Sequence, residues 1–195
     1  MANGKIKTAV ITGEHPYDVV GFQSMLRTIP EIEVYPQNMW DFITDPARDP
    51  GNYNLKNHPE MLQDPARDPV NYEVLLFYNV HQRTPAEEDG KFEAAMKETL
   101  EGLGEGNQGI FLLHHALVAF PDWSLWRELS GMRHKGGTVP YALEQTVHID
   151  VADTEHPITA TLEPWDIVDE TYHTVDADED SHILLTTDHP QSMKT

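Results

Sequence analysis

The chain has 195 residues, of which 39% are hydrophobic, and this is enough for one ordinary domain with a buried core. Asp and Glu total 33 against 13 Lys and Arg, so the formal net charge is −20. Nucleic acids and anionic membranes bind through clustered cations, and we therefore expect neither as a partner. Because cysteine is absent, the sequence excludes a disulfide framework, a thiolate metal site and a Cys nucleophile.

The N-terminal segment contains only a four-residue apolar run, far shorter than the core of a signal peptide. No stretch of the chain is long and apolar enough for a membrane span. We expect a cytoplasmic protein.

The first predicted elements alternate between strand and helix. Residues 8–12 predict a strand, which Gly13–Pro16 ends with a turn. Apolar residues then recur at helical spacing from Tyr17 until Pro30, and residues 32–35 predict a second strand.

Between about residues 36 and 71 the periodicity disappears and a long irregular loop is expected. It contains Asp-Pro-Ala-Arg-Asp-Pro twice, at 45–50 and at 64–69, which we interpret as a local duplication because a solenoid needs at least three repeats. Loops of this length are functional lids or disordered segments, and the sequence leaves both open.

A buried-type strand is predicted for 73–78, followed by Asn79 and His81. Thr84-Pro-Ala-Glu87 has the pattern of a capping box and predicts the start of a helix, which the Gly-rich segment 102–106 ends. This Gly-rich segment precedes a strand instead of following one, so it is a linker and not a phosphate loop.

The next strand, 109–113, is a continuous apolar run, and we expect it to be buried on both faces. His114 and His115 follow it at its carboxyl end. Residues 121–131 predict a helix with Trp123 and Trp126 on one face, for which core packing is favoured over sugar stacking.

Strands are predicted for 146–151, 167–172 and 181–187. The alternation along the chain predicts one three-layer α/β domain with a mainly parallel sheet. In such a sheet the carboxyl ends of the strands meet at one edge, where ligands bind. His15, His81 and His114 or His115 follow three of the predicted strands, so we expect them to converge at that edge.

The segment 169–173 places two carboxylates, a phenol and an imidazole close together. In a strand, Asp169 and His173 share one face, whereas Glu170 and Tyr172 share the other, so only one set can line a pocket. A histidine near a glutamate is typical of general acid/base catalysis. The same groups could bind a divalent metal such as zinc, for which His15, His114 and Glu170 are the candidate ligands. No Gly-x-Ser-x-Gly elbow is present to support nucleophilic catalysis.

Four motifs in this order resemble those of the trehalose-utilisation, or ThuA-like, family: Gly109–Leu117 with Asp122-Trp123, His156–Thr159, Asp169–Tyr172 and Thr187–Pro190. The resemblance implies a class I glutamine amidotransferase-like domain, a flavodoxin-like fold, in which the Cys nucleophile is lost, so glutaminase activity is not expected. It also implies work on trehalose-type disaccharides or their keto derivatives. Relatives usually continue into a Gly-rich strand ending in Leu-Gly-His, and the sequence leaves two alternatives open: this chain is truncated, or that final strand is dispensable here.

Our leading hypothesis is therefore an enzyme that hydrolyses, eliminates from or isomerises a sugar or keto sugar without a Cys nucleophile. By the resemblance, the catalytic candidates are His114 and Glu170 as the working pair, with His15, Asp169 and Tyr172. The substrate-binding candidates are Glu14, Asn79, His81, Trp123 and His173. Two alternatives stay open: a non-catalytic carbohydrate-binding or regulatory protein, and a metal-dependent sugar enzyme. A small carbohydrate is the expected ligand, and a homo-oligomer is expected on base rates.

Overall fold

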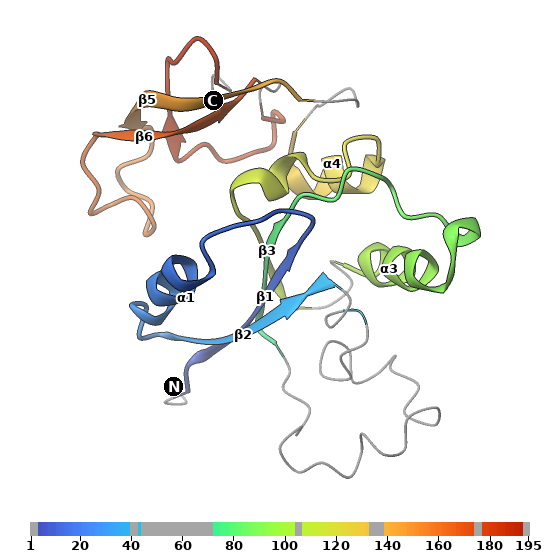
Figure 1. The fold of residues 1–195 in the computed structure, drawn as a ribbon. Coiled ribbons are helices and arrows are strands. Elements are labelled where there is room, and N and C mark those ends of the chain that lie inside the picture. Colours follow the sequence, from blue (N-terminus) through green and yellow to red (C-terminus); the bar gives the residue numbers. More distant parts are fainter. Residues whose placement is uncertain are drawn as a thin grey trace. The chain divides into compact units, whose positions relative to one another are not determined.

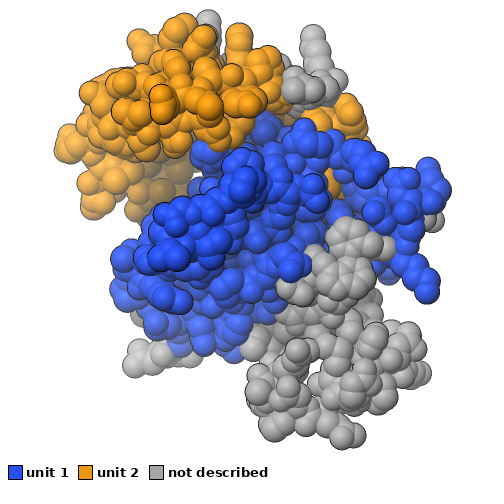
Figure 2. All heavy atoms as spheres, viewed as in Figure 1, with its two compact units in different colours: residues 1–119 blue, residues 120–195 orange. Residues whose placement is uncertain are grey.

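The computed structural model describes residues 4–39, 43, 72–103, 107–132, 139–173 and 177–192. The chain divides into two compact units, Met1–Ala119 and Phe120–Thr195, which are coloured separately in Figure 2. Each unit has its own β-sheet, and each is described below by itself.

The first unit is built on a parallel sheet of four strands. In chain order these are β1 (Ile6–Gly13), β2 (Ile32–Asn38), β3 (Val74–Asn79) and β4 (Gly109–Leu112). Their order in the sheet is β2-β1-β3-β4, and every neighbouring pair is parallel. The central strands carry the core: Val10 and Ile11 of β1 and Phe77 of β3 are each 0% exposed. Continuous apolar runs of this kind are typical of strands that are covered on both faces.

Two α-helices lie on opposite sides of this sheet (Figure 1): α1 (Val19–Arg27) and α3 (Lys91–Glu101). The chain moves one way along the sheet from β1 to β2 and the other way from β3 to β4. Because such crossovers are right-handed, this reversal places the two connecting helices on opposite faces. Helix, sheet and helix form three layers, so the predicted flavodoxin-like α/β fold is confirmed.

The strand β2 continues into the segment that the sequence predicted as loop. Pro36 pairs with Val10 inside the ladder. A proline is tolerated here because β2 is at the edge of the described sheet, where one side of the strand needs no hydrogen-bond donors. Most of the predicted loop, including both copies of its repeat, lies outside the described residues.

The predicted start of the second helix is wrong. Residues 84–86 are not helical, a short 3-10 turn η4 (Glu87–Asp89) follows, and α3 begins only at Lys91. Gly90 has a φ of 134°, which a helix cannot contain, and it separates the capping pattern from the helix. The predicted end is confirmed, since Gly102 caps α3.

The expectation that 109–113 is buried on both faces is also wrong. Gly109 is exposed, and Phe111 is 53% exposed. Among the described residues β4 pairs only with β3, so it forms an edge of the sheet. The apolar run predicts a strand, but its burial depends on neighbours that the run itself does not specify.

The second unit contains one α-helix, α4 (Ser124–Ser130), among its described residues, and an antiparallel sheet of three strands. Gly131 ends α4 with a φ of 62°, a left-handed conformation that glycine adopts without strain. The strands are β5 (Tyr141–Val151), β6 (Trp165–Tyr172) and β7 (Leu185–Thr186), in the order β6-β5-β7. The register of β5 on β6 shifts between Ala142 and Gln145, a bulge that contains Glu144 at a φ of 53°.

Strands were expected in this part of the chain, but their pairing into a separate antiparallel sheet was not.

Among the described residues, no helix combines the length and the apolar character needed to cross a bilayer.

Candidate functional site

The ends of β1, β3 and β4 bring several predicted site residues together in the first unit. Gly13 pairs with Asn79 in register, and Leu112 pairs with Phe77, so the three strands end at the same edge of the parallel sheet. We call the side chains that gather there the carboxyl-edge cluster: Glu14, His15, Tyr78, Asn79, His81, His114 and His115. The sequence predicted this convergence from the order of strands and histidines.

Asn79 connects two of the imidazoles. It is the last residue of β3 and is 0% exposed. Its side-chain Nδ2 lies 3.1 Å from Nδ1 of His81, and its main-chain oxygen lies 3.2 Å from Nδ1 of His115. The sequence analysis proposed Asn79 as a substrate-binding residue and did not predict these two contacts. The only hint in the sequence is that a polar residue directly follows a buried-type strand.

His81 is packed tightly against the end of β1. A Cβ at Gly13 would lie 2.7 Å from Cε1 of His81, far below any normal contact, so the ring occupies the space that a side chain at position 13 would need. Burial lowers the pKa of His81, because an imidazolium loses hydration there, and the nearby Glu14 carboxylate opposes this shift. The neutral imidazole is therefore the form of His81 present at pH 7.

The two consecutive histidines of the turn η5 (His114–Val118) have different surroundings. His115 is 1% exposed and lies between two aromatic rings, stacked on Tyr78 at a centroid distance of 4.4 Å and tilted against His15 at 4.5 Å. His114 is half-buried, and its ring is perpendicular to that of His115 at 5.2 Å. His115 thus has the surroundings of a packing residue, whereas His114 stays partly accessible.

The backbone is left-handed at two turns of this edge. Glu14 has a φ of 59° and His114 a φ of 55°, in the region that non-glycine residues rarely adopt. Each such residue costs roughly 1–2 kcal/mol of conformational energy relative to ordinary backbone. Strained backbone of this kind is concentrated at functional sites, and both of these residues were predicted site residues.

An aromatic group extends the carboxyl-edge cluster toward α1. Phe22 stacks on Tyr78 at 4.6 Å with an interplanar angle of 23°, and Tyr17 contacts both rings edge-on at 5.6 Å and 5.4 Å. All three side chains are only partly buried. They form an apolar surface beside the imidazoles. Small-molecule sites usually combine mostly apolar walls with a few polar groups in this way.

The acidic-aromatic segment lies on β6, in the second unit. The hydroxyl of Tyr172 donates a hydrogen bond to Oε1 of Glu170, and Oδ1 of Asp169 accepts one from the main-chain N–H of Glu170 at 2.8 Å. Glu170 and Tyr172 therefore share one face of the strand, as the sequence predicted. On the other face Thr171 is buried, while Asp169 is exposed.

Two further predicted residues are also in the second unit. Trp123 is 8% exposed and packs edge-on against Phe120 at 5.6 Å, which supports core packing over sugar stacking. His173 is exposed, and its main-chain N–H donates to the carbonyl of Pro140. In the part of the chain that the structure describes, no three His, Asp or Glu side chains form a group that could hold a metal ion.

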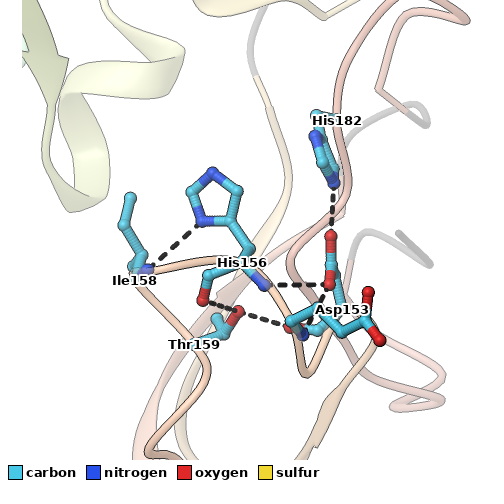
Figure 3. A network of polar contacts seen from close by, with 6 residues as sticks. Asp153, His156, Ile158, Thr159 and His182 are labelled. Carbon is cyan, nitrogen blue, oxygen red and sulfur yellow. Dashed lines mark hydrogen bonds and ion pairs between the residues drawn. The ribbon is translucent and has the colours of Figure 1, made fainter.

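The motif His156–Thr159 forms a turn in the second unit (Figure 3). Asp153 accepts hydrogen bonds from the main-chain N–H groups of Glu155 and His156, and its Oδ2 lies 2.8 Å from Nε2 of His182. These bonds, first that from Glu155 and then that from His182, lower the pKa of Asp153. The hydroxyl of buried Thr159 donates to the Asp153 carbonyl. The sequence analysis assigns His182 no role and does not predict its contact with Asp153.

Comparison with known proteins agrees with this architecture. Residues 57–194 match the model of a family described as ThuA, trehalose utilisation. A crystal structure of a putative ThuA-like protein from Bacteroides uniformis is similar, with a TM-score of 0.61 and 18% sequence identity over 100% of this chain and 74% of that one. At this identity the likeness concerns the fold. No curated protein matches the chain.

Proposed function

The chain belongs to the ThuA family of trehalose utilisation, and from that premise we propose that it acts on trehalose-type disaccharides or their keto derivatives by acid/base chemistry. The observation that carries this proposal is the carboxyl-edge cluster, in which three parallel strands each deliver a histidine to one edge of the sheet. Ligands of open α/β sheets bind outside this edge.

The chemistry proposed for the cluster is proton transfer to and from sugar oxygens. Imidazoles suit this task because their ordinary pKa is close to neutral pH, and a positioned acid or base contributes about 10²–10⁴-fold to the rate. His114 is the proposed catalytic group, since it is the partly accessible member of the pair in η5. His15, exposed and in contact with His115, is proposed to orient the substrate.

Recognition of the sugar is assigned to the aromatic group beside the imidazoles. The C–H faces of a pyranose ring are apolar, and the partly exposed rings of Tyr17, Phe22 and Tyr78 offer a matching surface. A neutral sugar also suits the charge of the protein, because the net charge of −20 repels anionic substrates.

Glu170, on β6 in the second unit, is a further proposed catalytic residue, and its match to the family motif supports this role. Its carboxylate accepts a hydrogen bond from the Tyr172 hydroxyl, which fixes the position of one oxygen on the strand face. Glu170 and Tyr172 are proposed to act together, with Tyr172 holding the carboxylate in place.

Turnover of a panel of disaccharides and keto disaccharides, followed by NMR of the products, tests the proposal. Product spectra distinguish hydrolysis, elimination and isomerisation. We expect His114→Ala and Glu170→Gln to lower turnover by about 10²–10⁴-fold, whereas His148→Ala, at an exposed histidine of β5, leaves it unchanged. If turnover of every active sugar survives both of the first two substitutions, the proposed mechanism is wrong.

The two alternatives give different results in the same experiments. Calorimetric binding of a sugar without any product after hours indicates a non-catalytic carbohydrate-binding or regulatory protein. Elemental analysis of protein purified without a His-tag, combined with turnover under a chelator, tests metal dependence. If zinc is present in stoichiometric amount and a chelator abolishes turnover, the metal-dependent mechanism is favoured over metal-free acid/base chemistry.

A further inference from the structure

We propose that Asn79 is a positioning residue that holds two neighbouring histidines in opposite tautomers: His81 with its proton on Nε2 and His115 with its proton on Nδ1. The two contacts come from different parts of one residue. The side-chain amide of Asn79 holds His81, and the main-chain carbonyl holds His115.

The assignment for His81 follows from the donor properties of the amide. Nδ2 of Asn79 can only donate hydrogen bonds, and it lies 3.1 Å from Nδ1 of His81. Nδ1 must therefore accept and carries no proton. A neutral imidazole has a single N–H, so the proton of His81 is on Nε2.

The assignment for His115 follows from the acceptor properties of the carbonyl. A main-chain oxygen can only accept, and that of Asn79 lies 3.2 Å from Nδ1 of His115. Nδ1 of His115 is therefore the protonated nitrogen. The ring is 1% exposed and lies between Tyr78 and His15, which keep its plane fixed.

Both rings are held by packing as well as by hydrogen bonds. Asn79 is 0% exposed at the end of a central strand, so its amide has no room to follow a moving partner. The His81 ring also meets Gly13, where a Cβ would be 2.7 Å from Cε1. Strand register therefore determines the tautomer, since residues 13 and 79 are paired neighbours on β1 and β3.

This arrangement gives His81 a defined chemical role. Because burial lowers its pKa, His81 is neutral at pH 7 and presents an N–H at Nε2. Such an imidazole donates a hydrogen bond to a hydroxyl or carbonyl oxygen and does not take a proton through that nitrogen. Proton abstraction would then belong to another group, with His114 as the candidate. This role toward a sugar oxygen rests on the proposed function, whereas the tautomers themselves do not.

Long-range ¹H–¹⁵N NMR of the ¹⁵N-labelled full chain near pH 7 reads the tautomer of each histidine directly. The signals are assigned by their loss in His81→Phe and His115→Phe. We expect the Nε2–H pattern for His81 and the Nδ1–H pattern for His115. The rotated amide, with Oδ1 accepting from a protonated Nδ1, predicts Nδ1–H for His81, and that spectrum would overturn the inference.

Asn79→Asp provides the matched perturbation. A carboxylate can only accept, so it should move the His81 proton to Nδ1 and raise the pKa of His81 by about one unit or more. His115 should keep its Nδ1–H pattern, because its partner is the main chain, and it serves as the internal control for folding. If the His115 pattern shows that the variant is folded and the His81 tautomer is nevertheless unchanged, the proposed role of the Asn79 side chain is wrong. If this variant does not fold, the wild-type spectrum alone decides.

Titration with the active sugar separates this inference from the proposed function. If the predicted tautomers are found and sugar shifts the Nε2 signal of His81, the donor role is supported. If the tautomers are found but no sugar perturbs any signal of the cluster, the proposed function fails while the positioning role of Asn79 stands.

Discussion

Gly13→Ala is the substitution for which the structure gives the clearest expectation. The added Cβ would lie 2.7 Å from Cε1 of His81, whereas unstrained carbon atoms stay about 3.5–4.0 Å apart. The ring must therefore move back by roughly 1 Å. A displacement of this size is enough to break the hydrogen bond in which Nδ1 lies 3.1 Å from Nδ2 of Asn79.

The energetic cost has two parts and one offset. Overpacking of a filled site costs about 1–3 kcal/mol, and loss of the hydrogen bond costs a further 0.5–1.5 kcal/mol or so. Replacing glycine by alanine also restricts the unfolded chain, which returns about 0.4–1 kcal/mol. We expect Gly13→Ala to lower the free energy of unfolding by about 0.5–4 kcal/mol, with a central value of about 2 kcal/mol.

Equilibrium urea unfolding of Gly13→Ala measures this loss, and Gly4→Ala is the matched control. No atom lies within 4 Å of a Cβ at Gly4, so that variant should stay within about 0.5 kcal/mol of wild type. In Gly13→Ala the His81 signals should also lose the Nε2–H pattern. Two variants of equal stability, with an unchanged His81 spectrum, would refute the packing of His81 against β1.

Two further predictions concern the second unit. The pKa of His148 is raised, mainly by its hydrogen bond to Asp166, so this pair stabilises the fold below the ordinary histidine pKa of 6.5 and the contribution is lost as the pH rises through the raised value. Asp166→Asn should therefore lower the melting temperature near pH 5.5 but not near pH 9, and an equal effect at both would contradict the pairing. Trp126 is 1% exposed, and its ring centroid lies 4.9 Å from that of Phe120. Trp126→Ala should therefore lower the free energy of unfolding in urea by about 3–5 kcal/mol, and Trp126→Phe should lower it by less. A loss below about 1 kcal/mol would show that this tryptophan is not a core residue.

Local patterns in the sequence were sufficient to predict most of the first unit. A short apolar run predicts a strand, and apolar residues at helical spacing predict the helix that follows it. Once the sheet is taken as parallel, the positions of His15, His81 and His114 after three of its strands imply their convergence. This part of the site could be predicted because it follows from the order of elements alone.

Features that depend on packing across strands could not be predicted in this way. The contact of His81 with Gly13 requires the register that pairs positions 13 and 79, which nothing in either strand specifies. The link from Asn79 to His115 likewise joins residues 36 positions apart. The exposure of Phe111 reflects its place at an edge of the described sheet, which is also a long-range property.

The capping pattern at Thr84 failed for a local reason. Thr84-Pro-Ala-Glu87 satisfies the spacing of a capping box, but Gly90 follows within one turn and adopts a φ of 134°. Glycine is a weak helix former, so it interrupts the element and α3 begins after it. A matching motif therefore predicts a helix start only when no strong breaker follows it.

The left-handed backbone at Glu14 and His114 has a consequence for any attempt to engineer this protein. Glycine would adopt either conformation with less strain, so a design that optimises thermal stability alone would choose it at both positions. The gain in backbone energy would come with the loss of a carboxylate and an imidazole from the edge of the sheet. At these two turns, backbone stability favours glycine, whereas the proposed chemistry requires the carboxylate and the imidazole.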